Sequence, residues 1–150
     1  MIHTDILHVF SPYLIASAVA YLMTECIKII ILTCRHREFR WREFFKTGGM
    51  PSSHSAVVAS LATAIGLLEG FGTATFAIAI ILAAIVITDA THVRRAVGEQ
   101  GEVIKKIIEH DAKLQKPYFS RGHKPMEALV GVILGITIGI VVAYLSVGQG

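Results

Sequence analysis

The sequence predicts an all-α integral membrane protein: one polytopic domain over residues 1–150, with about four transmembrane helices and a cytoplasmic amphipathic helix. Apolar residues make up 53% of the chain and charged residues only 17%, below the roughly 25% charged residues of a soluble domain. Neither Lys nor Arg occurs in residues 1–27, 47–93 or 125–150. Because 150 residues cannot cover several helices that are apolar all round, lipid is their expected environment.

Four stretches are candidates for membrane spans, since a helix needs about 20 mostly apolar residues to cross a bilayer. The first contains Glu25 and Lys28, and the third is Ala, Ile, Leu and Val until Asp89. Glycines recur every four residues in the fourth, which predicts a smooth helix face for close packing. The four predicted spans are residues 12–32, 51–68, 75–90 and 126–147, and the glycines are Gly131, Gly135 and Gly139.

Basic residues set the expected orientation. All fourteen lie at Lys28, within residues 35–46, or within residues 94–124. The positive-inside rule places both basic loops in the cytoplasm. We therefore expect a multi-pass protein of the cell membrane with both termini outside.

Residues 93–114 form the third connection, in which apolar residues recur at helical spacing among charged ones. This pattern indicates an amphipathic helix that continues from the third span or lies in the interface. It could pack on the bundle, on the membrane or on another subunit. Four short spans bury little surface, so we also expect a homo-oligomer, formed through this helix or through an exposed glycine face of span four.

Cys26 and Cys34 would lie about 12 Å apart on one helix, too far for a disulfide. We interpret both as buried small apolar residues. The cysteines form no metal-binding pattern, and the sequence predicts no metal and no cofactor.

Every predicted span brings polar groups to the cytoplasmic side. Unpaired ionisable groups are costly at a membrane, so their convergence indicates a functional site. The groups are Lys28 on span one, Ser52, Ser53 and His54 on span two, Asp89, Arg94 and Arg95 after span three, and His123 and Glu127 before span four.

These residue types suit phosphate chemistry. Pro51 and Pro125 mark two helix N-termini, where free N–H groups and the helix dipole attract anions. Lys28, Arg94 and Arg95 add positive charge. His54 and His123 stand beside this predicted site, and histidine is a common nucleophile or general acid at neutral pH.

The motifs resemble those of the type-2 phosphatidic acid phosphatase superfamily, which includes the vanadium-dependent haloperoxidases. Pro51-Ser52-Ser53-His54 resembles its Pro-Ser-Gly-His motif, and His123-x3-Glu127-x3-Gly131 resembles its His-x3-Asp-x3-Gly segment. Lys28-x6-Arg35 has the spacing of its first motif, with His36 in place of Pro. The best match is the divergent, small bacterial and plant branch, over roughly residues 28–139: it shares Gly-Gly-Met-Pro-Ser-Ser-His-Ser from Gly48, Asp followed by Val-Arg-Arg, and Gly-His-x-Pro-x-Glu from Gly122.

The resemblance implies hydrolysis through a phosphohistidine without a metal. His123 would attack phosphorus, Glu127 would orient its ring, and His54 would protonate the leaving oxygen. Phosphate oxygens would be held by Lys28 and the backbone around Ser52 and Ser53. Pro117 stands where the family has an arginine before the nucleophile. Arg94 or Arg95, from the end of span three, could supply the missing guanidinium group.

The sequence thus predicts a membrane phosphatase acting on a phosphatidyl or polyprenyl phosphate or diphosphate at the cytoplasmic face. The alternative is a non-catalytic phospholipid-binding or membrane assembly protein that retains the phosphate site. Expected partners are the phosphorylated lipid and membrane lipids. Nucleic acid is not expected as a partner, because acidic residues interrupt the basic stretches. The positive-inside rule already explains where the basic residues lie.

Overall fold

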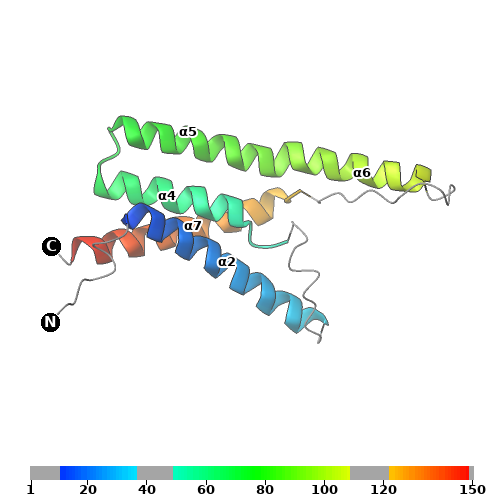
Figure 1. Cartoon of the computed structure of the whole chain (residues 1–150), viewed down its shortest axis with the longest axis horizontal. Coiled ribbons are helices and arrows are strands. Elements are labelled where there is room, and N and C mark those ends of the chain that lie inside the picture. Colours follow the sequence, from blue (N-terminus) through cyan, green and yellow to red (C-terminus); the bar gives the residue numbers. More distant parts are fainter. Residues whose placement is uncertain (1–10, 37–48, 109–121, 149–150) are drawn as a thin grey trace.

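The computed structural model describes residues 11–36, 49–108 and 122–148, and every element in these ranges is a helix (Figure 1). The predicted all-α class is confirmed. In chain order the elements are α2 (Pro12–His36), α4 (Ser53–Leu68), α5 (Ala74–Thr88), the π-helix η1 (Asp89–Val93), α6 (Arg94–Ile108) and α7 (Pro125–Val147).

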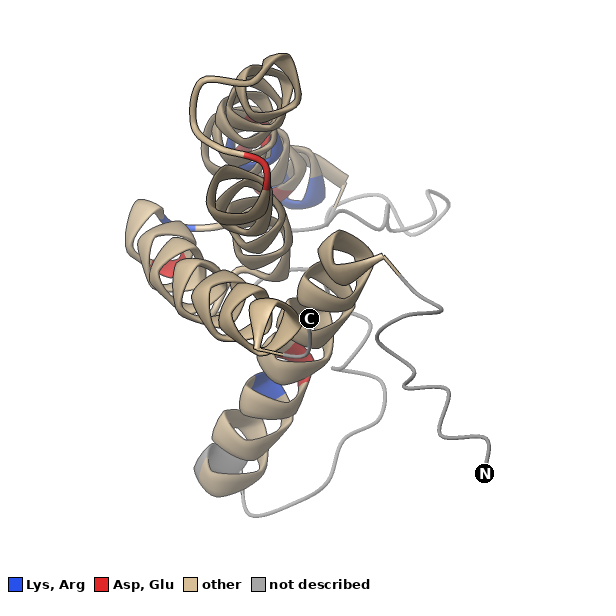
Figure 2. Ribbon diagram, turned by 90° about the vertical axis from the view of Figure 1, so that its left-hand side faces the viewer, with Lys and Arg blue, Asp and Glu red and all other residues tan. Residues whose placement is uncertain are grey.

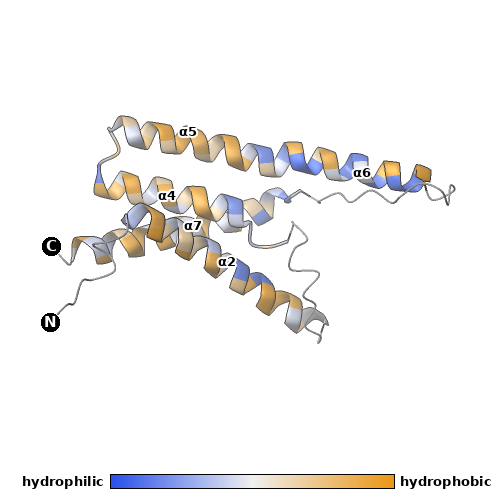
Figure 3. Ribbon diagram, viewed as in Figure 1, coloured by the Kyte–Doolittle hydropathy of each residue, from blue (hydrophilic) through white to orange (hydrophobic). Residues whose placement is uncertain are grey.

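Within the described ranges, three helices are long and apolar enough to cross a membrane: Pro12–Cys34, the continuous Ala74–Ile108, and Pro125–Val147. Helix α4 is apolar but has only 16 residues, so its crossing stays a prediction. Figure 3 shows apolar residues along all the helices, with hydrophilic residues where α4, α7 and the α5–α6 junction meet. Charged residues are sparse along the ribbon (Figure 2). These features agree with a membrane helix bundle.

Helix α4 lies at the centre and contacts α2, α5 and α7. It is built largely of Ala and Ser, whose small side chains allow close approach of neighbouring helices. Across the bundle, Ala56 and Ala64 of α4 form one buried cluster with Ala16 and Ala20 of α2 and with Ile138 and Val142 of α7. Helix α4 begins at Ser53 rather than at Pro51, which lies just before the capping residue Ser52.

The glycine row of α7 faces α4. A Cβ atom on Gly131 would overlap the carbonyl oxygen of Ser52, and one on Gly135 would overlap that of Ala56. A Cβ on Gly139 would lie 2.7 Å from the Cβ of Thr63. Close packing through this row is thus present within one chain. The prediction of an exposed glycine face for contact between copies is wrong, because α4 already covers it.

Helices α5 and α6 form one rod through η1, where the Arg94 N–H donates to the Asp89 carbonyl oxygen (Figure 1). The amphipathic segment therefore continues from the third span as far as Ile108, and residues 109–114 lie outside the described ranges. Apolar residues of α6 such as Val97 and Ile107 are exposed. Cys26 and Cys34 are also exposed, so their predicted burial is wrong; α2 turns them away from the bundle.

Candidate functional site

The N-terminus of α4 is fixed by two buried serines. Ser52 is the N-cap, and its Oγ accepts hydrogen bonds from the backbone N–H of Ser55 at 3.3 Å and from the Ser55 hydroxyl at 3.1 Å. A capping side chain satisfies one of the free N–H groups of a helix start. The Ser52 side chain therefore holds the helix start, and the predicted contact of phosphate with the backbone around Ser52 and Ser53 stays a prediction.

The start of α7 lies against the start of α4. The Ser52 N–H donates to the Glu127 carbonyl oxygen at 3.0 Å, and Gly131 packs one turn further along. Two sequence motifs separated by about half the chain therefore meet at one point. The helix N-termini predicted to form a phosphate site do lie together.

His123 and Glu127 form a largely buried pair of titratable side chains. His123 is only 3% exposed, and its Nδ1 lies 3.3 Å from Glu127 Oε2. The same carboxylate oxygen accepts the Lys124 N–H at 3.1 Å, which fixes the carboxylate at the first turn of α7. Contact with the carboxylate fixes the orientation of the His123 ring, which also hydrogen-bonds to the Gly49 backbone.

Burial lowers the pKa of His123 below its ordinary value of 6.5, and the positive charge of Lys28 lowers that pKa as well. Hydrogen bonds from the ring to Glu127 and to the Gly49 backbone, together with the Glu127 charge, oppose this effect. The neutral ring is thus favoured, which is the form that a nucleophile needs.

The segment before α7 is anchored on η1. The His123 N–H donates to the Ala90 carbonyl oxygen at 3.0 Å. Gly122 lies so close to the backbone of Arg94 and Arg95 that a Cβ atom there would overlap it. Single π turns occur often at functional sites, and this one carries the main-chain acceptor that holds His123.

His54 faces His123 from the first turn of α4. Their ring centroids are 6.2 Å apart and the rings are tilted by 59°. The buried Nδ1 of His54 has no hydrogen-bond partner among the described residues. The charges of Arg94, Lys28 and Asp89 all act on this ring. His54 is therefore near the predicted nucleophile without being tied to a carboxylate.

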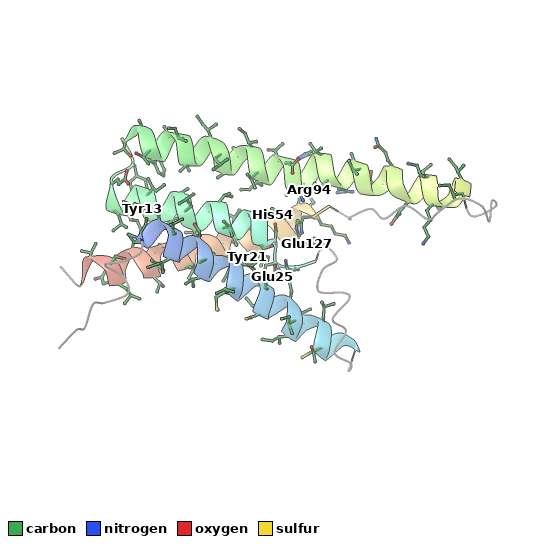
Figure 4. All side chains as sticks on the ribbon, in the orientation of Figure 1. Tyr13, Tyr21, Glu25, His54, Arg94 and Glu127 are labelled. Atoms are coloured by element: carbon green, nitrogen blue, oxygen red, sulfur yellow. The ribbon has the colours of Figure 1, made fainter. Side chains whose placement is uncertain are left out.

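Lys28 reaches the same point from α2. Its Nζ donates to Ser53 Oγ at 3.1 Å and to Glu25 Oε1 at 2.7 Å. The Lys28 and Glu25 side chains are 16% and 13% exposed. The sequence analysis identified Glu25 only as a polar residue of the first span. Its position near the start of α4 follows from the contact between α2 and α4. Figure 4 shows Glu25, His54, Glu127 and Arg94 in this region, while Tyr13 lies towards the far end of the bundle.

The two arginines after span three differ. Arg94 Nε pairs with Asp89 Oδ2 at 2.8 Å across η1. Arg95 Nε pairs with Glu99 Oε1 at 3.0 Å along α6. Of these two arginines, Arg94 is the one whose charge acts on His54. The side chain of Arg35 lies outside the described part, and within it no three His, Cys, Asp or Glu side chains are placed to hold a metal ion.

Comparison with known proteins gives two matches. The model of the family described as "Divergent PAP2 family" matches residues 10–138. The uncharacterized membrane protein YuiD of Bacillus subtilis (strain 168) is 35% identical over 147 residues of the alignment. The match covers 87% of this chain and 93% of that protein. No solved structure matches the chain.

Proposed function

The chain belongs to the divergent PAP2 family, and from this premise we propose that it is a membrane phosphatase for a phosphorylated lipid. The observation that carries the proposal is the buried His123–Glu127 pair, with Nδ1 and Oε2 3.3 Å apart and the His54 ring alongside. This is the arrangement that a nucleophilic histidine and a separate proton donor need.

In the proposed reaction Glu127 accepts the Nδ1 hydrogen of His123, and Nε2 forms a bond to phosphorus. The bond from phosphorus to the lipid oxygen breaks, and that oxygen takes a proton from His54. Water then attacks the phosphohistidine, releases inorganic phosphate and restores His123, while His54 accepts the proton from water. No redox partner is needed, and the charges balance over the two steps.

The phosphate oxygens would contact Lys28, the start of α4 and Arg94. In support, Lys28 already touches Ser53, and the Arg94 charge acts on His54. Arg94, held by Asp89, would supply the guanidinium that the family's third motif carries where this chain has Pro117. Donors placed before the reaction stabilise the charge that develops on phosphate.

We further propose that the site faces the cytoplasm and that both termini lie outside. The basic residues cluster in the two connections next to the site, residues 35–46 and 94–124, and such connections are usually cytoplasmic. The exposed apolar residues of α6 support a homo-oligomer formed through that helix. The lipid chains of the substrate would lie beside the apolar faces of α2 and α7.

A non-catalytic phospholipid-binding protein is the second candidate. In its favour, Lys28 and Arg94 are each paired with a carboxylate, so neither carries an uncompensated charge towards a reacting phosphate.

The test is phosphate release from a panel of phosphatidyl and polyprenyl phosphates and diphosphates by the purified protein in nanodiscs, with and without chelator. We expect release from at least one lipid, unaffected by chelator and lost in His123→Ala. Binding without release would favour the second candidate, and full activity in His123→Ala would refute the mechanism.

A further inference from the structure

Glu25 stands beside the proposed phosphate site without a part in the proposed reaction. Its Oε1 lies 2.7 Å from Lys28 Nζ, and only 13% of its side chain is exposed. An ionisable group so placed near the membrane interior is costly unless it is paired or has a function. The pairing explains how the Glu25 carboxylate is tolerated there. It also places a negative charge beside the ammonium group with which Lys28 would bind a ligand.

Lys28 is shared between two partners. Its ammonium group has three N–H donors, and two of them point to Glu25 and Ser53. A phosphate bound by the third would have an oxygen close to the Glu25 carboxylate. Two negative charges at such a short distance repel each other strongly where water is scarce.

We infer that Glu25 selects the singly charged form of a phosphate: it accepts a hydrogen bond from a P–OH group and repels a phosphate that carries a second negative charge. This inference rests on the proposed phosphate site. It narrows the substrate class to a lipid monophosphate that binds as its monoanion, and it disfavours the more highly charged diphosphates.

Other titratable groups face the pair from every helix packed on α2. From α4 comes His54, and from α7 and the segment before it come Glu127 and His123; the Lys28 charge acts on both histidines. These groups are shared by the parent and a Glu25 variant. A comparison of the two proteins therefore isolates the contribution of Glu25 to any pH dependence.

The probe is a short-chain alkylphosphonate, whose P–C bond the proposed reaction cannot break. Its affinity for the purified protein is measured by calorimetry at about pH 5 and about pH 9.5, on either side of the second ionisation of the phosphonate, which lies above the pKa of about 6 of a phosphate monoester. We expect the parent to bind the phosphonate more weakly at the higher pH. Glu25→Gln, which removes the charge but keeps an acceptor for Lys28, should bind the dianion on the order of tenfold more tightly than the parent does.

Two variants serve as controls. Glu25→Asp keeps the charge and should retain the pH dependence of the parent. Glu99→Gln makes the same substitution in the exposed Arg95–Glu99 pair and should leave binding unchanged. If Glu25→Gln does not fold, Glu25→Ala, which leaves Lys28 in place, should also lose the discrimination against the dianion.

Equal pH dependence in the parent and Glu25→Gln would refute the inference and leave the proposed function intact. Loss of binding at both pH values in Glu25→Gln, with recovery in Glu25→Asp, would also refute it, because Glu25 would then only position Lys28. No binding by the parent at either pH would instead refute the phosphate site itself.

Discussion

The backbone N–H of Ser52 donates a hydrogen bond to the carbonyl oxygen of Glu127 at 3.0 Å, and so the starts of α4 and α7 are joined. Each of these helix starts carries one histidine of the proposed reaction, His54 on α4 and His123 just before α7. This main-chain contact therefore contributes to the distance between the two rings, together with the packing of Gly131 on Ser52. The packing of α4 on α7 is a condition for the site.

Gly135→Ala tests that packing. The added Cβ would overlap the Ala56 carbonyl oxygen, so α4 and α7 must separate. We expect a loss of about 1–3 kcal/mol in unfolding free energy, the usual cost of overpacking, measured by denaturant titration in mild detergent. Gly72→Ala, where nothing lies within 4 Å of the new Cβ, is the matched control. Equal stability of the two variants would contradict the described packing.

Glu127→Gln should lower the pKa of His123 further. Burial lowers this pKa, whereas the Glu127 carboxylate raises it. Removal of the carboxylate charge therefore lets burial lower the pKa further. Titration of ¹⁵N-labelled histidines by NMR, with His123→Gln to assign the signal, measures the shift. A higher pKa in Glu127→Gln would mean that the pair is not formed as described.

Arg94 and Arg95 should differ in phosphate binding. Arg94 is turned by Asp89 towards the region where its charge acts on His54, whereas Arg95 pairs with Glu99 along α6. We expect Arg94→Gln to weaken alkylphosphonate binding by on the order of tenfold, as loss of one charged contact does. Arg95→Gln should bind nearly as the parent does. The reverse order would assign the missing guanidinium to Arg95.

The proposed topology places the α4–α5 connection and the end of α7 outside. With Cys26 and Cys34 replaced by Ala, a cysteine at Gly72 or Gly148 should react with a membrane-impermeant thiol reagent added to intact cells. A cysteine at Val97 of α6 should react only after the membrane is opened. The opposite pattern would move the site to the outer face.

Much of the fold followed from local patterns. The absence of charge predicted the apolar helices, and the glycine spacing predicted a close helix contact. The family resemblance implied that Glu127 orients the His123 ring, and the two side chains do meet.

The remaining contacts depend on how distant segments dock. The Ala90 carbonyl that holds His123 belongs to a π turn, and the backbone that requires glycine at position 122 belongs to the start of α6 directly after it. No residue pattern in the chain announces that turn. The partner of the glycine row could not be inferred either, because a small-residue face fits a helix of the same chain as well as one of another copy. Glu25 gained a place at the site only through the contact of Lys28 with Ser53.

Detection of a phosphorylated His123 tests the central claim most directly. The protein is mixed with a ³²P-labelled lipid phosphate that has an activated leaving group, quenched within a turnover, and assayed for acid-labile, base-stable label. We predict label in the parent and in His54→Ala, since such a leaving group needs little protonation, and none in His123→Ala. Label that persists in His123→Ala, or phosphate release by the parent without any labelled intermediate at any time, would contradict the account.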